Sequence, residues 1–209
     1  MKLTQKKNFK KKYNIILDID ETLVHCKNIN NKFRIILRPY LKKFLEFCYL
    51  HFNVGYWTIG VKDYCTGVLQ KILTKEQYDN TKLIIARNEP TNNSLYIEII
   101  NNHLFRLKKL DKVYTKSLHY LFTNNLYSNK FNMNNTIIID NNPYVTAVNP
   151  NISILIPSFY SNRNDNYLLE IISWLKMIKN GYSKSIYKME KPNFFRNLNF
   201  LEKKVYETV

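Results

Sequence analysis

Two aspartates, Asp18 and Asp20, stand one residue apart directly after the apolar run "IIL" at 15–17. An aspartate fixed at the end of a strand can attack a phosphorus atom and form an aspartyl phosphate. A second carboxyl group within reach can protonate the leaving oxygen and later take a proton from water. The pair therefore indicates phosphoryl transfer, while the alternative is that both are turn residues, a common role for aspartate after a strand.

Polar side chains also follow two later apolar runs, with Thr58 after "NVGYW" and Asp140 and Asn141 after "TIII". The carboxyl ends of parallel strands gather at one edge of a sheet, so we expect these groups near Asp18 and Asp20. Three carboxylates at short range repel each other, and Mg²⁺ bound by carboxylate and carboxamide oxygens would remove the repulsion. Thr58 also fits the simple role of a strand former, and Asn141 that of a turn residue.

The elements that must position these groups alternate between short apolar strands and amphipathic helices, which predicts an α/β fold with a parallel sheet flanked by helices. Asn-rich turn residues between two β-prone runs predict a hairpin at 24–37. Strands are expected at 15–17 and within 53–60, 134–143 and 151–157, and helices within 38–52, 61–73, 111–127 and 164–180.

The 209 residues divide into three parts. Residues 1–12 read as a basic flexible arm because clustered lysines repel each other, 13–180 as one domain, and 181–209 as a basic, aromatic extension. The runs "KLIIAR" and "SLYIEII" predict a β-rich insertion over about 79–107 that interrupts the alternation. Gly181 is expected to cap the last helix.

The composition restricts the class of protein. An apolar fraction of 45% excludes a disordered chain. A net charge of +16 favours polyanionic partners: phosphorylated peptides, an anionic membrane surface or nucleic acid, the last through the basic arm. Three cysteines without metal or disulfide spacing predict a reducing, intracellular environment. Without an apolar run of membrane-spanning length or a signal-peptide pattern, we expect a soluble protein.

The segment "IILDIDETLV" resembles the DxDxT signature of haloacid-dehalogenase superfamily phosphatases, and more closely that of the small C-terminal-domain phosphatases and NLI-interacting-factor-like proteins. "RPYLKKFLEF", "GYWTIGVKDY", "RLKKLDKV" and "TIIIDNNPYV" follow in the order of that family's RPxxxEFL, FTASxxKY, VKDLSRL and LILDNSPxxY segments. The resemblance spans roughly residues 13–178 and implies a Rossmann-like fold with a small β-sheet inserted between the second and third motifs.

The resemblance also implies roles for the matching residues. Asp18 is the expected nucleophile, and Asp20 the general acid and base. Thr22 is expected to orient the loop beside the substrate, and Thr58 to bind the phosphoryl group. The metal ligands implied for Mg²⁺ are the residues of the first and fourth motifs, Asp18, Asp20 (through its carbonyl), Asp140 and Asn141.

Two basic positions stay open. Lys108 aligns with the lysine of the third motif, with Lys109 beside it as a rival, and either also fits a plain solvated lysine. Arg38 is a candidate contact for an anionic substrate, but its place before Pro39 at a helix start suits a structural role equally well. "WTIG" departs from the family's "FTAS" around Thr58, which keeps the donor and changes the pocket.

Three functions follow from these observations. The first is a Mg²⁺-dependent serine/threonine phosphatase acting on a phosphorylated protein or peptide, such as the repetitive tail of RNA polymerase. The second keeps the chemistry and changes the substrate to a polynucleotide or nucleotide, as the net charge suggests. The third is a non-catalytic module that binds a phosphopeptide or RNA, which the presence of both Asp18 and Asp20 argues against.

Overall fold

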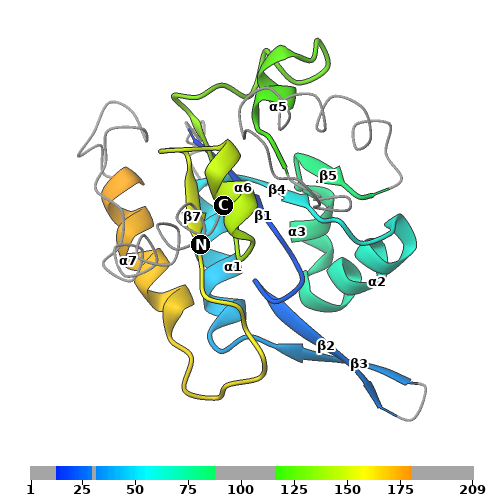
Figure 1. Ribbon diagram of the computed structural model, residues 1–209. Coiled ribbons are helices and arrows are strands. Elements are labelled where there is room, and N and C mark those ends of the chain that lie inside the picture. Colours follow the sequence, from blue (N-terminus) through cyan, green and yellow to red (C-terminus); the bar gives the residue numbers. More distant parts are fainter. Residues whose placement is uncertain (1–12, 30–31, 88–115, 180–209) are drawn as a thin grey trace, which may run out of the picture.

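A computed structural model describes residues 13–29, 32–87 and 116–179 of the chain (Figure 1). Five parallel strands form the central sheet, in the order β5 (Leu83–Ile85), β4 (Asn53–Trp57), β1 (Asn14–Leu17), β6 (Thr136–Asp140) and β7 (Ser153–Leu155). The predicted α/β fold with a parallel sheet is confirmed. Because β1 lies between β4 and β6, the three strand ends that carry the polar groups are neighbours.

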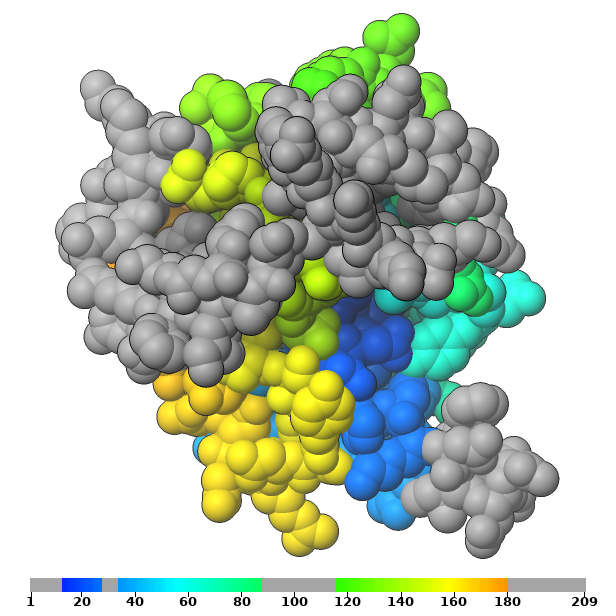
Figure 2. Space-filling view, viewed as in Figure 1, coloured from blue at the N-terminus to red at the C-terminus, as the bar shows by residue number. Residues whose placement is uncertain are grey.

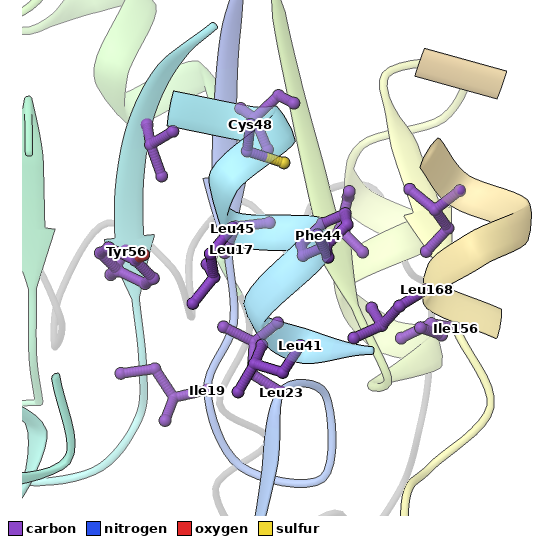
Figure 3. Packing of buried hydrophobic residues seen from close by; sticks show 14 of the residues in the cluster. Leu17, Ile19, Leu23, Leu41, Phe44, Leu45, Cys48, Tyr56, Ile156 and Leu168 are labelled. Atoms are coloured by element: carbon purple, nitrogen blue, oxygen red, sulfur yellow. The ribbon is translucent and has the colours of Figure 1, made fainter. Parts of the chain in front are cut away.

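Helices cover both faces of the sheet: α1 (Leu41–His51), α2 (Lys62–Ile72) and α7 (Tyr167–Lys179) on one, and α5 (His119–Thr123) and α6 (Pro143–Val148) on the other. Successive side chains of a strand point to opposite faces. Two hydrophobic cores result: the first lies between the sheet and α1, α2 and α7, and the second between the sheet and α5 and α6. Leu17 of β1 packs in the first core and Ile16 in the second. Figure 3 shows Phe44 and Leu45 of α1 packed between Leu17 of β1 and Leu168 of α7.

The apolar face of α1 and the start of α6 follow from the local sequence. In α1, four buried residues recur at helical spacing and form one apolar stripe, Leu41, Phe44, Leu45 and Cys48. In α6, Pro143 occupies the first turn, where its missing N–H costs nothing, and Asn142 caps the helix by accepting a hydrogen bond from the main-chain nitrogen of Tyr144 at 3.0 Å. The short α6 follows β6 directly, so it fixes the chain just beyond Asp140.

The hairpin predicted at 24–37 is also confirmed. It consists of β2 (Val24–Ile29) and β3 (Lys32–Leu37), which pair antiparallel and form a separate sheet. In Figure 1 the hairpin extends away from the central sheet. Since β2 begins four residues after Asp20, the hairpin borders the same loop as the two aspartates.

Two local predictions need correction, and one helix was not predicted. The strand in "KLIIAR" does not stand outside the alternation, because β5 pairs with β4 at the edge of the main sheet. The helix expected over 111–127 is confined to α5 within the described residues, since the chain turns at Asn124, whose side-chain oxygen accepts a hydrogen bond from the nitrogen of Leu126. A further helix, α3 (Lys75–Asp79), begins with a capping box between Thr74 and Gln77.

The arm at 1–12, the remainder of the expected β-rich insertion at 88–107, Gly181 and the extension at 181–209 lie outside the described residues. In the segments that are described, none of the helices has the length and apolar character that a membrane crossing requires.

Candidate active site

Asp18 lies at the carboxyl end of the central strand and is 4% exposed. Its main-chain nitrogen donates a hydrogen bond to the oxygen of Ile139 in β6, and the nitrogen of Thr58 donates one to Ile85 in β5. These bonds extend the sheet ladder one residue past the strands and bring Asp18, Thr58 and Asp140 to one edge of the sheet. The predicted convergence of the three strand ends is therefore present in the fold.

The surface at this edge is visible in Figure 2. The dark blue surface of the first described residues lies between the yellow surface of the chain that follows β7 and the cyan surface of α2. The elements that surround the aspartates thus come from three distant parts of the sequence.

A buried lysine joins two of the carboxylates. The Nζ atom of Lys116 donates hydrogen bonds to Asp18 Oδ1 and, at 2.6 Å, to Asp140 Oδ2. Burial opposes the charge on Lys116, but the attraction of Asp140 and Asp18 outweighs it and raises the pKa of the ammonium group. Lys116 is therefore a cation at neutral pH, held beside the expected nucleophile.

The lysine of the third motif was expected at Lys108 or Lys109, which both lie outside the described residues. The sequence holds a signal that favours Lys116: "TKSLHYL" reproduces the Lys-x-Leu-x-x-Leu spacing of the family's "VKDLSRL", whereas "RLKKLDKV" has Val113 in place of the last leucine. Both leucines after Lys116, Leu118 and Leu121, are fully buried in the second core. Their packing anchors the segment that carries the lysine.

Asp20 lies in the loop after β1, and the hydroxyl of Tyr64 in α2 donates a hydrogen bond to its Oδ1 atom. Burial raises the pKa of the Asp20 carboxyl, the bond from Tyr64 lowers it, and the charge of Asp18 raises it again, with a net upward shift. The Tyr64 hydroxyl also lies 2.8 Å from Cys26 Sγ in β2. Sequence reasoning assigned Tyr64 no role, although it stands in the second motif.

The glycine of the unusual "WTIG" sequence has a steric basis. The Thr58 hydroxyl, in a residue 1% exposed, accepts a hydrogen bond from the nitrogen of Gly60 at 3.0 Å. A Cβ atom on Gly60 would lie only 2.9 Å from the ring of Tyr64, so glycine leaves room for the residue that contacts Asp20. Because Thr58 accepts this bond, its own hydrogen can be donated to a phosphoryl oxygen.

Asn141 is oriented by three hydrogen bonds. The Thr22 hydroxyl donates to its Oδ1 atom at 3.2 Å, and its Nδ2 atom donates to Ser158 Oγ at 2.9 Å and to Glu21 Oε2 at 3.4 Å. The amide oxygen therefore faces the loop that carries Asp20. Ser158 stands beyond β7 in sequence and was not predicted; no motif marks it.

The donor chemistry of this edge fits Mg²⁺. In the described segments, His, Cys, Asp and Glu side chains alone do not form a metal-binding group of three or more. Hard oxygen atoms are nevertheless available from two carboxylates and an oriented amide, those of Asp18, Asp140 and Asn141. One lysine cannot balance three carboxylates, and a divalent cation would complete the compensation.

The pKa of Asp140, the second carboxyl group that contacts Lys116, is shifted by its burial. Burial raises this pKa, while the charge of Lys116 and the hydrogen bond from the nitrogen of Asn142 partly offset the effect. Even beside Lys116, the carboxyl group of Asp140 is therefore harder to ionise than an ordinary aspartate.

Arg38 does not suit the substrate contact considered from the sequence, because its side chain is completely buried. The guanidinium donates two parallel hydrogen bonds to Asp165, at 2.9 and 2.7 Å, and others to the main-chain oxygens of Thr22 and Pro157. It also lies 5.6 Å from the ring centroid of Phe159. Arg38 therefore connects the loop after β1 to the segment before α7 through hydrogen bonds. This is the structural role that the sequence suggested as the alternative to a substrate contact.

Replacement of Arg38 by methionine is expected to destabilise the protein by about 3–5 kcal/mol, because it leaves the Asp165 carboxylate buried without its partner. Denaturant unfolding measures this change. At a temperature where the variant is folded, the KM for substrate should stay within about threefold of the wild-type value, since Arg38 offers no exposed surface. A large rise in KM with unchanged stability would return Arg38 to the substrate site.

Sequence comparison places this chain among phosphatases. A family model described as "NLI interacting factor-like phosphatase" matches residues 13–187. The "Putative CTD phosphatase-like protein 355R" of Invertebrate iridescent virus 6 is 23% identical over 192 residues, which cover 81% of this chain and 98% of that protein. "CTD small phosphatase-like protein 1" of Caenorhabditis elegans is 24% identical over 194 residues, covering 85% of this chain but only 33% of the relative.

Among solved structures, that of Fcp1, described as an essential RNA polymerase II CTD phosphatase, aligns with a TM-score of 0.51 and 16% sequence identity. The alignment covers 88% of this chain and 56% of Fcp1. At this identity the likeness concerns the fold alone, and it agrees with the parallel sheet described above.

Proposed function

Because the chain belongs to the NLI interacting factor-like phosphatase family, we propose that it hydrolyses phosphoserine or phosphothreonine in a protein substrate, with Mg²⁺ as cofactor. The observation that carries this proposal is the placement of Lys116 between Asp18 and Asp140 at the carboxyl edge of the sheet. A protonated lysine there places positive charge beside the nucleophile, where a phosphoryl group would bind.

The first step is attack of an Asp18 carboxylate oxygen on phosphorus. The new O–P bond forms as the bond to the serine or threonine oxygen breaks, and Asp20 gives its proton to that leaving oxygen. Lys116 and the hydroxyl of Thr58 donate hydrogen bonds to the phosphoryl oxygens, where negative charge is spread in the transition state.

The second step releases phosphate. Asp20, now a carboxylate, takes a proton from water, whose oxygen bonds to phosphorus as the bond to Asp18 breaks. Asp18 returns as a carboxylate, Asp20 as an acid, and inorganic phosphate leaves. Bound Mg²⁺, for which Asp18, Asp140, Asn141 and the carbonyl of Asp20 are the proposed ligands, would neutralise phosphoryl charge in both steps.

A phosphorylated protein is the substrate that the relatives favour. Two curated relatives carry the words "CTD phosphatase-like" or "CTD small phosphatase-like", and Fcp1 is described as an RNA polymerase II CTD phosphatase. The net charge of +16 also suits a polyanionic partner. The phosphorylated C-terminal repeat of RNA polymerase II is accordingly the first substrate to test.

Phosphate release from a phosphoserine repeat peptide and from a 5′-phosphorylated oligonucleotide, at equal concentrations, tests the substrate class. We expect turnover of the peptide with Mg²⁺, loss of turnover in excess EDTA, and recovery when Mg²⁺ is restored in excess. Turnover of the oligonucleotide alone would favour a polynucleotide phosphatase instead. Turnover of neither substrate, with retained peptide binding, would favour the non-catalytic module.

Replacement of Asp20 by asparagine is expected to lower kcat/KM on a phosphoserine peptide by about 10²–10⁴-fold, since it removes the proton donor for a poor leaving group. An aryl phosphate with an acidic phenol as leaving group needs less protonation and should lose much less. Parallel assays on the two substrates give the ratio. Equal losses on both would contradict the role of general acid.

The pH profile provides a second test of Asp20. Its pKa is raised above the ordinary carboxyl value, so the proton required for the first step persists to higher pH than in a free aspartate. The rate of phosphorylation of Asp18 should fall as pH rises through this pKa. Rapid-mixing measurements of the first step should show that limb in the wild type and not in Asp20→Asn, because an amide does not titrate in this range.

A further inference from the structure

We propose that Asn149, at the end of α6, is a positioning residue for Lys116. This inference rests on the proposed function, because Lys116 matters only if it acts on a phosphoryl group. Asn149 is 2% exposed and lies outside the aspartate loop, and no motif in the sequence marked it.

The side chain of Asn149 holds the main chain of Lys116 at two points. Its Nδ2 atom donates to the carbonyl oxygen of Lys116 at 2.6 Å, and its Oδ1 atom accepts from the nitrogen of Leu118 at 2.7 Å. A carboxamide that bonds to the C=O of one residue and the N–H of the second residue after it imitates a neighbouring strand. The two bonds together restrict both the position and the direction of the backbone at residue 117.

Asn149 is itself held firmly. Its Nδ2 atom also donates to the carbonyl oxygen of Val145 in α6 at 2.7 Å, and its own carbonyl accepts from Ser153 Oγ of β7 at 2.9 Å. The carboxamide therefore uses both its donor hydrogens and its oxygen in buried bonds. It connects the lysine segment to the helix and strand that follow Asp140.

This connection matters because the task of Lys116 is geometric. Its ammonium group must reach both Asp18 and Asp140 from a backbone that belongs to neither of their strands. A displacement of about 1 Å in a catalytic group can cost about 10²-fold in rate. Asn149 fixes the backbone from which the lysine side chain extends, so its loss should be expressed as misplacement of the ammonium group.

Asn14 offers a matched control. It is 3% exposed, and its Nδ2 atom likewise donates to a main-chain carbonyl, that of Lys130, at 2.9 Å, and to Asn135 Oδ1 at 3.0 Å. Asn14 begins β1, so it lies at the opposite end of the strand from Asp18. Replacement of either asparagine by alanine breaks a buried hydrogen-bond network, but only Asn149 contacts the lysine segment.

A double-mutant cycle on the full chain tests the inference. Asn149→Ala should lower kcat/KM for a phosphopeptide by about 10–100-fold with most of the loss in kcat, whereas Asn14→Ala should change it by less than about threefold. In a Lys116→Met background, Asn149→Ala should add less than about a threefold loss. Multiplicative losses in the double mutant would overturn the inference, because they would mean that Asn149 acts independently of Lys116.

A second readout does not require activity. Modification of lysines by an amine-reactive reagent, followed by mass spectrometry, should label Lys116 at least about tenfold faster in Asn149→Ala than in the wild type or Asn14→Ala, because its segment is released. Equal protection of Lys116 in all three proteins would overturn the inference even if no phosphatase substrate were found. If Asn149→Ala does not fold, Asn149→Ser serves in both assays, since one hydroxyl cannot hold both ends of the segment.

Discussion

Replacement of Asp18 by asparagine is expected to abolish phosphomonoester hydrolysis, with a fall in kcat of at least about 10⁴-fold. The amide has nearly the same shape as the carboxylate but is a very poor nucleophile, so the aspartyl phosphate cannot form. Lys116 and Asp140 would remain in place around it. Steady-state assays with an aryl phosphate, together with acid trapping of the phosphorylated enzyme, measure both the rate and the intermediate.

Asp79→Asn is the control for this change, because Asp79 lies in α3 and its side chain is 56% exposed. Its activity and its yield of trapped intermediate should equal those of the wild type. An Asp18→Asn protein that still accumulates a covalent phosphate, or retains a tenth of the wild-type rate, would move the nucleophile to another residue.

Replacement of Lys116 by methionine is expected to lower kcat by about 10²–10³-fold, because it removes a preorganised cation from a buried site where charge develops in the transition state. Methionine keeps much of the apolar stem and its packing. The change also leaves Asp18 and Asp140 without their shared partner, so thermal unfolding should show a loss of stability. The rate is therefore measured at a temperature where the variant is fully folded.

Lys108→Met and Lys109→Met are the decisive comparisons, since the alignment of the third motif with "RLKKLDKV" predicted one of these two positions. Both variants should retain kcat within about threefold of the wild type if Lys116 is the phosphoryl-binding lysine. A loss in Lys108→Met as large as that in Lys116→Met would restore the original alignment of the third motif.

Much of the fold and half of the site could be predicted from local sequence. Short apolar runs predicted β1, β4, β6 and β7, and helical spacing predicted α1, α2 and α7. Polar residues at the ends of these strands then pointed to one edge of the sheet, where Asp18, Thr58, Asp140 and Asn141 do lie. These predictions succeed because burial patterns and strand ends are properties of neighbouring residues.

The second half of the site depends on contacts between distant segments. The pairing of Asp18 with Lys116 spans 98 residues, and that of Arg38 with Asp165 spans 127. The two leucines after Lys116 mark its segment, but nothing local shows that its ammonium group meets Asp18 and Asp140. Likewise, nothing local distinguishes Arg38 before a proline from a residue that contacts substrate. The placement of β5 also depends on distant contacts, because a run of three apolar residues does not indicate which sheet the strand will join.

The sequence by itself determined that this chain builds a parallel sheet and places two aspartates, a threonine and an Asp-Asn pair at strand ends, because each of these features is written in consecutive residues. Only the tertiary structure decided which cation neutralises the carboxylates, that Arg38 is internal, and that Tyr64 and Asn149 support Asp20 and Lys116. The physical reason is that charge and hydrogen-bond partners are selected by burial and distance. Both are set when segments far apart in the chain pack together.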